Sequence, residues 1–196
     1  MKKTLVAFAL CQLFAAGAAN AATIIDTGVP NSNYSGGWTL ASYQWLAGEF
    51  SLGTATTITD VQGWIGSGND GTATAAIYTD GGNVPGTELF SAAFTADSVD
   101  DWDGASGLSW LLDAGTYWVA YEVRAGQTLS GYMPGTSPSP LGNEAFTSGG
   151  TYVDGDFLNI GVRILGAQGA QVPEPASLAL LGIGLAGLGL SRRRKA

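Results

Sequence analysis

The sequence predicts an all-β protein: a jelly-roll-like antiparallel β-sandwich with an N-terminal signal peptide before it and a single C-terminal transmembrane helix after it. Composition is the first reason for the sandwich. In residues 22–171, glycine supplies 25 of 150 positions, yet this segment also holds all six tryptophans and all seven tyrosines. Disordered low-complexity chains lack such aromatic content, so the glycines are expected to separate many short strands.

The second reason is an alternation of side chains with the period of a β-strand. In TYWVAYEVR (116–124), one face holds Tyr117, Val119, Tyr121 and Val123, and the other holds Trp118, Ala120, Glu122 and Arg124. In FLNIGVRIL (157–165), Leu158, Ile160, Val162 and Ile164 form an apolar face. No stretch before residue 176 has the period of an amphipathic helix.

Turn-forming sequences separate the expected strands. The further predicted strands are Tyr43 to Leu52, Thr56 to Ile65, Thr72 to Thr79, Glu88 to Thr95, Leu108 to Leu112 and Gln127 to Met133. Between them lie GSGNDG, DGGNVPG, DWDGASG, DAG and MPGTSPSP, which are rich in the residues that turns require. We therefore expect eight to ten strands in two sheets, forming one ectodomain over residues 22–168.

Residues 1–21 have the features of a secretory signal peptide. Lys2 and Lys3 precede an apolar run, and the small-x-small sequence Ala19-Asn20-Ala21 follows it. Cys11, the only cysteine, lies within this peptide, so the mature chain is expected to begin at Ala22 without any thiol.

Charge and composition exclude several functions for residues 22–171. This segment has 15 acidic residues and two basic ones, so its formal charge of 2 − 15 = −13 argues against nucleic acid as a partner. The chain has no histidine, which removes the usual general base and the usual nucleophile pairs. Catalysis would have to depend on carboxylates.

The C-terminus combines three features in order. A linker, residues 169–175, contains Val172-Pro173-Glu174-Pro175; an apolar segment, 176–191, follows; and residues 192–196 carry Arg192, Arg193, Arg194 and Lys195. The apolar segment is expected to be a transmembrane helix of marginal length, and the basic tail is expected to be cytoplasmic by the positive-inside rule. A plain tail anchor is the alternative interpretation.

This terminus resembles a PEP-CTERM sorting signal. The resemblance implies that an exosortase, a membrane-embedded transpeptidase-like cysteine protease, recognises the chain near Pro173 to Pro175 and releases or transfers the ectodomain. It also implies transient anchoring in the inner membrane and then a place at the cell surface or outside the cell. The family's association with exopolysaccharide implies a role in an extracellular matrix or biofilm.

The ectodomain shows a second resemblance. IYTDGGNVPGTELF (77–90) and LDAGTYWVAYEV (112–123) are similar to the β-sandwich ectodomains of bacterial surface proteins of the choice-of-anchor type. This similarity implies a fold rather than an activity.

Four aspartates surround Trp102 in ADSVDDWDGASG and form the densest acidic cluster: Asp97, Asp100, Asp101 and Asp103. Carboxylates in a glycine-containing loop suit calcium, but the sequence has only a fragment of an EF-hand loop. A solvated acidic loop is the alternative that we favour, so no cofactor is expected and calcium is the one metal considered.

Three tryptophans beside glycine or aspartate are candidate glycan contacts: Trp38, Trp64 and Trp102. Exposed aromatic rings stack on sugars, although each ring could equally cover an edge of the core. The sequence thus favours a non-enzymatic exported matrix protein, with a carbohydrate-binding module as the alternative. A carboxylate-dependent polysaccharide hydrolase is the third hypothesis. It ranks last because, among 15 acidic residues, some pair will have the spacing of glycosidase carboxylates by chance.

Overall fold

The computed structural model describes residues 21–30, 37–135, 139–148, 150–155 and 158–168. In these residues the chain forms thirteen strands and no helix. The strands make two antiparallel sheets, so the predicted β-sandwich is confirmed. The predicted signal peptide and transmembrane helix lie outside the described residues.

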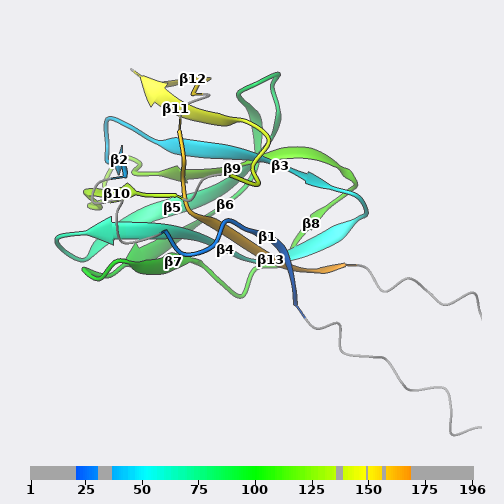
Figure 1. Cartoon of the computed structure of the whole chain (residues 1–196), viewed down its shortest axis with the longest axis horizontal. Coiled ribbons are helices and arrows are strands. Elements are labelled where there is room, and N and C mark those ends of the chain that lie inside the picture. Colours follow the sequence, from blue (N-terminus) through cyan, green and yellow to red (C-terminus); the bar gives the residue numbers. More distant parts are fainter. Residues whose placement is uncertain (1–20, 31–36, 136–138, 149, 156–157, 169–196) are drawn as a thin grey trace, which may run out of the picture.

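The first sheet has seven strands and is built around the long strand β4. In chain order its strands are β1 (Ala22–Asp26), β2 (Trp38–Leu40), β4 (Thr56–Ser67), β7 (Asp101–Ala105), β8 (Trp110–Leu112), β10 (Gly131–Met133) and β13 (Val162–Gln168). The order is β1-β13-β4-β10-β2, and β7 and β8 also pair with β4. Figure 1 shows β4, β7 and β13 together in the lower layer.

The second sheet has six strands in the order β12-β11-β3-β9-β5-β6. Its strands are β3 (Leu46–Leu52), β5 (Gly71–Asp80), β6 (Pro85–Ala96), β9 (Gly115–Glu122), β11 (Glu144–Ser148) and β12 (Thr151–Asp154). β3, β11 and β12 lie in the upper layer of Figure 1. β5 and β6 form a hairpin whose DGGN turn places Gly82 and Asn83 at φ 81° and 64°, where glycine and asparagine are tolerated.

The main core lies between the sheets. The predicted apolar faces supply much of it: Val119, Tyr121, Val123, Leu158, Ile160, Val162 and Ile164 are all buried within one cluster. The hydroxyl of Tyr121 crosses the core and donates to the carbonyl of Gln62 on β4. Alternation in β9 and in the segment leading into β13 was therefore predicted correctly.

The structure differs from the prediction in strand number and in several boundaries. β1, β2, β11 and β12 were not predicted, and β13 begins at Val162 instead of residue 157. The DWDGASG segment, predicted as a turn, contains strand β7. Its local composition favours a turn, but Trp102 lies directly opposite Trp64 on β4, and this pairing with a central strand prevails.

The outer face of the six-stranded sheet is also buried in part. Ala47, Trp118, Ala120 and Ala145 form a second cluster, and Tyr78, Val84 and Tyr152 pack against it. Trp118 is fully buried, and its indole N–H donates to Asp80 at 3.2 Å. Small alanines leave room for these large rings, so β9 is buried on both faces.

Candidate functional sites

The four predicted calcium ligands are divided between a loop and a strand. Asp97 and Asp100 precede β7, and Asp101 and Asp103 belong to it. Three of them already accept hydrogen bonds, Asp97 from the Val99 N–H, Asp100 from the Tyr132 hydroxyl and Asp101 from the Trp102 N–H. Asp97 and Asp101 therefore shape the β6–β7 connection, and Asp100 links it to β10.

Asp103 has the most unusual environment of the four. One carboxylate oxygen, Oδ2, is buried without a hydrogen-bond partner. Burial, and next the charge of Asp97, raises the pKa of Asp103 to about 6, although the backbone N–H of Asp97 opposes the shift. Among the described residues no three carboxylates come close enough to hold a metal together, so calcium at these aspartates stays a prediction.

The structure brings together two of the three candidate tryptophans. Trp64 and Trp102 meet edge to face on the seven-stranded sheet, with ring centroids 5.4 Å apart and an interplanar angle of 89°. The guanidinium of Arg163 lies 4.0 Å from the Trp102 centroid and is held by Asp26 at 3.1 Å. Trp38, on the edge strand β2, packs instead against the main core.

A buried carboxylate that sequence analysis did not single out lies on the other sheet. Glu122 is fully buried, and its Oε1 accepts hydrogen bonds from Tyr78 and Tyr152, both at 2.7 Å. Its Oε2 accepts one from Arg124 Nε at 2.6 Å, and Arg124 also pairs with Glu88 at 2.7 Å. We call these five residues the Glu122 network.

The contacts of the Glu122 network keep its hydrogen-bond donors protonated. Burial raises the pKa of the Tyr78 and Tyr152 hydroxyls, and the carboxylate of Glu122 raises it further. Both phenols therefore remain donors at any physiological pH. Hydrogen bonds from Arg124 to Glu122 and Glu88 outweigh burial and raise the guanidinium pKa. The two phenols and the guanidinium thus have the protonation states that their contacts require.

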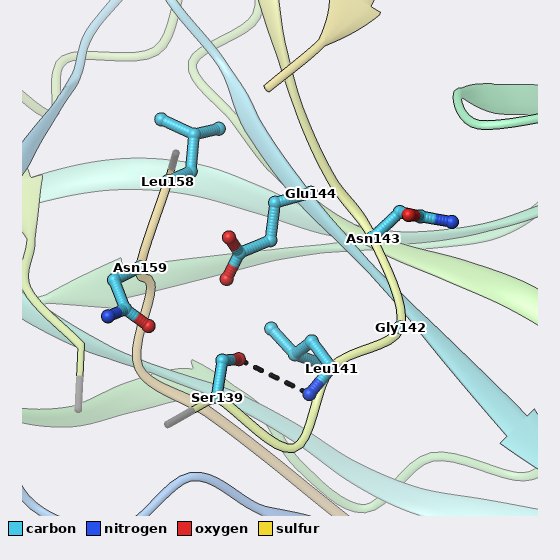
Figure 2. A pocket seen from close by; sticks show the side chains of 7 residues that line it. All are labelled: Ser139, Leu141, Gly142, Asn143, Glu144, Leu158 and Asn159. Atoms are coloured by element: carbon cyan, nitrogen blue, oxygen red, sulfur yellow. Dashed lines mark hydrogen bonds between the residues drawn. The ribbon is translucent and has the colours of Figure 1, made fainter. Parts of the chain in front are cut away.

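A pocket of about 310 Å³ lies beside β11. Its lining residues, which Figure 2 draws, are Ser139, Leu141, Gly142, Asn143, Glu144, Leu158 and Asn159. Glu144 is only 6% exposed, and burial raises its pKa to about 7, although the Ile160 N–H and the Ser139 hydroxyl oppose the shift. We call this the Glu144 pocket.

Local sequence signals differ for the two buried glutamates. Glu122 alternates with Trp118 and Ala120 in a predicted strand, so its face could have been identified as a packed one. Glu144 follows LGN in a segment where no strand was predicted, and its pocket partner Asn159 is 15 positions later. No local sequence pattern indicates that Glu144 and Asn159 line the same pocket.

The C-terminal residues match a known family model. Residues 171–195 match the model described as the PEP-CTERM protein-sorting motif. The chain carries a PEP-CTERM sorting motif. Such a motif marks an exported protein that is anchored in a membrane and then processed by an exosortase at the surface, so the predicted resemblance is confirmed.

The remaining comparisons add limits. No curated protein matches this chain. The predicted sorting residues, Val172 to Pro175 and Arg192 to Arg194, lie outside the described residues, as does the predicted helix 176–191. In the part of the chain that the structure describes, no helix has the length and hydropathy needed to cross a bilayer.

Proposed function

We propose that the mature protein is a non-enzymatic component of the cell surface or extracellular matrix, associated with exopolysaccharide and delivered by exosortase processing. The sorting motif at residues 171–195 carries this proposal, because it assigns a route of export to the β-sandwich that precedes it. The ectodomain would be the cargo of that route and would supply no catalytic group to the processing reaction.

The chemistry of the ectodomain supports a non-enzymatic role. With no histidine and no cysteine after residue 11, it has neither a histidine to serve as general base nor a thiol nucleophile. Glu122, the most buried carboxylate among the described residues, already accepts hydrogen bonds from two phenols and a guanidinium. A hydrolase screen on polysaccharides tests this part, and reproducible turnover by the purified protein would contradict it.

Intact mass tests the processing step. We expect protein recovered from the native host to begin at Ala22 and to end near Pro173 to Pro175, with any extra mass identifying an attached group. In an exosortase-deficient strain the same measurement should show the complete C-terminal segment. A complete tail in both strains would leave a simple membrane-anchored sandwich and would overturn the proposal.

Carbohydrate binding is the second candidate, and the Trp64–Trp102 pair favours it. Two half-buried indoles share one outer face of the sheet, beside the guanidinium of Arg163. Stacking on a sugar would use whichever ring edge or face remains accessible. Arg163 already covers one face of Trp102, which is why we rank this function second.

A glycan array with matched variants tests the second candidate. Trp64→Ala and Trp102→Ala should each abolish binding if the pair is the site. Tyr43→Ala is the control, because Tyr43 is an aromatic residue that is 70% exposed and is not part of the Trp64–Trp102 pair. Equal loss in all three variants would indicate unspecific adhesion to aromatic surfaces instead.

A further inference from the structure

The Glu144 pocket lies at the edge of the sandwich, between β11 and the segment that leads into β13. Glu144 is directly opposite Gly48 of β3, on the side where Leu141 of the main core covers that glycine. The carboxyl therefore points between the two sheets and not toward solvent. Asn159, in the segment before β13, forms the facing wall.

Two oxygen atoms in this pocket are buried without hydrogen-bond partners. They are Oε1 of Glu144 and Oδ1 of Asn159, and no hydrogen bond joins the two side chains. Figure 2 shows both groups turned into the pocket, with the Ser139 hydroxyl on the adjacent wall. The Ile160 N–H and the Ser139 hydroxyl hydrogen-bond to the Glu144 carboxylate, but Oε1 has no partner. A buried carboxylate oxygen without a partner is costly, so we expect a donor or a positive charge between Oε1 and Oδ1 of Asn159.

Within residues 22–171, no basic side chain is available to supply that charge. Arg124 and Arg163 are the only basic residues between positions 22 and 171. Arg124 pairs with Glu88 and Glu122, and Arg163 pairs with Asp26. Ser139 Oγ accepts the N–H of Leu141 at 3.2 Å, and its hydroxyl hydrogen-bonds to Glu144, so it has no second proton to donate to Asn159 Oδ1.

We propose that the Glu144 pocket is a binding site for a hard metal cation of the calcium class, with Glu144, Asn159 and Ser139 as its oxygen ligands. Carboxylate, amide and hydroxyl oxygens are the ligands that such ions prefer. A pocket of about 310 Å³ also holds several waters, at roughly 30 Å³ each, to complete the coordination. A neutral sugar would leave the charge of Glu144 uncompensated.

This site differs from the aspartate cluster predicted from sequence. Its ligands come from two separate segments, and only one of them carries a charge. A single carboxylate implies modest affinity, in the range of about 10⁻⁴ to 10⁻³ M that is found in extracellular calcium modules. That range suits a protein exposed to calcium outside the cell.

Calorimetric titration with calcium chloride tests the proposal on the processed protein from the native host, after EDTA treatment and dialysis. We expect one site, and a thermal unfolding midpoint that rises with calcium concentration. Glu144→Gln keeps the shape of the side chain and should weaken binding by about tenfold or more. Asn159→Ala should weaken it less.

Two control variants decide where any bound calcium lies. Asp113→Asn removes one exposed negative charge away from the pocket and should leave the affinity unchanged. Asp103→Asn should also leave it unchanged, whereas loss of binding in Asp103→Asn with full binding in Glu144→Gln would assign the ion to the aspartate cluster. That result would overturn the proposal, and so would the absence of binding at calcium concentrations up to about 10 mM, roughly tenfold above the dissociation constants of the weakest extracellular calcium modules.

Discussion

Glu122 and Glu144 are both buried in the six-stranded sheet, but they differ in what surrounds them. Glu122 is fully buried and its two oxygens accept three hydrogen bonds, from two tyrosines and one arginine. Glu144 is 6% exposed, and its Oε1 accepts none. Burial alone therefore does not define a functional carboxylate, whereas burial without partners does point to a missing ligand.

The partners of Glu122 come mainly from neighbouring strands of its own sheet. Tyr78 is on β5, next to β9, and Arg124 follows Glu122 by two positions. Glu144 instead faces the other sheet, across the edge of the sandwich. The sheet that carries Glu122 also supplies its hydrogen-bond partners. Glu144 lies at the edge between the two sheets, where neither sheet supplies a partner for its Oε1 atom.

The largest effect that we predict is for Glu122→Gln. This change leaves Arg124 and the two tyrosine hydroxyls with an altered partner in a buried site, so the free energy of unfolding should fall by about 3 kcal/mol. Urea unfolding followed by tryptophan fluorescence measures the loss. Glu88→Gln is the matched control and should cost less than about 1 kcal/mol, because Glu88 is 38% exposed. Equal losses in the two variants would contradict the comparison.

Glu144→Gln should have the opposite sign. Because burial raises the pKa of Glu144 to about 7 in the folded state, the folded protein holds more protons than the unfolded chain between about pH 4.5 and 7. Wild-type stability should therefore fall as the pH rises through this range. In metal-free buffer at pH 8 the variant should be more stable by about 2 kcal/mol, and near pH 4 the difference should vanish.

Adding calcium sharpens this second prediction. At saturating calcium the free energy of unfolding of the wild-type protein should rise, because the ion binds the folded state and compensates the charge of Glu144. The free energy of unfolding of Glu144→Gln should rise little. Urea unfolding at pH 8, with and without calcium, gives the four values needed. A variant that is less stable than wild type in EDTA would contradict the prediction, because it would show that the hydrogen bonds from Ile160 and Ser139 outweigh the cost of the unpartnered oxygen of Glu144.

Tyr152→Phe should have an intermediate effect. It removes one hydrogen bond to a buried carboxylate and should lower the free energy of unfolding by about 1.5 kcal/mol. Tyr78→Phe removes a bond of the same length, 2.7 Å, and should have a similar effect. In the Glu122→Gln background both losses should shrink, which a double-mutant cycle measures. Additive losses would show that the tyrosines act through packing and not through Glu122.

The two carboxylates also show how much the sequence could predict. Alternation identified the strand that carries Glu122 and the inward face of the 158–164 segment, because both depend on local periodicity. The strand of Glu144 was not predicted, since EAFTS is short and follows a proline-rich turn region. Glu144 and Asn159 line one pocket because of the way the sheets pack, and no local pattern predicts that packing.

The tryptophan and aspartate candidates show a similar division. Local composition identified Trp64 and Trp102 as unusual, but only the pairing of β4 with β7 brings their rings together. The same pairing divided the aspartates between a loop and a strand, although the charges of Asp97 and Asp101 still act on Asp103. Sequence patterns thus predicted unusual residues better than they predicted the neighbours of those residues, because the neighbours depend on the register between strands.

The smallest effect that we predict is for Asp103→Asn, a carboxyl intermediate between the two glutamates. Burial and the charge of Asp97 raise the pKa of Asp103 to about 6, so the folded state gains protons relative to the unfolded chain between about pH 4 and 6. Stability should therefore fall as the pH rises through that window. Above it, the variant should be more stable than wild type by less than about 1 kcal/mol, because Asp103 remains partly solvated.

Salt provides the contrast with Glu144. Part of the Asp103 shift comes from the charges of Asp97 and Asp101, which salt screens, whereas the shift of Glu144 comes mainly from burial. Raising the ionic strength should reduce the advantage of Asp103→Asn and leave that of Glu144→Gln nearly unchanged. Urea unfolding at pH 7.5 in low and high sodium chloride measures both. If salt affected the two variants equally, the buried oxygen of Glu144 would be accessible to ions in solution, and its distinction from a surface carboxylate would be lost.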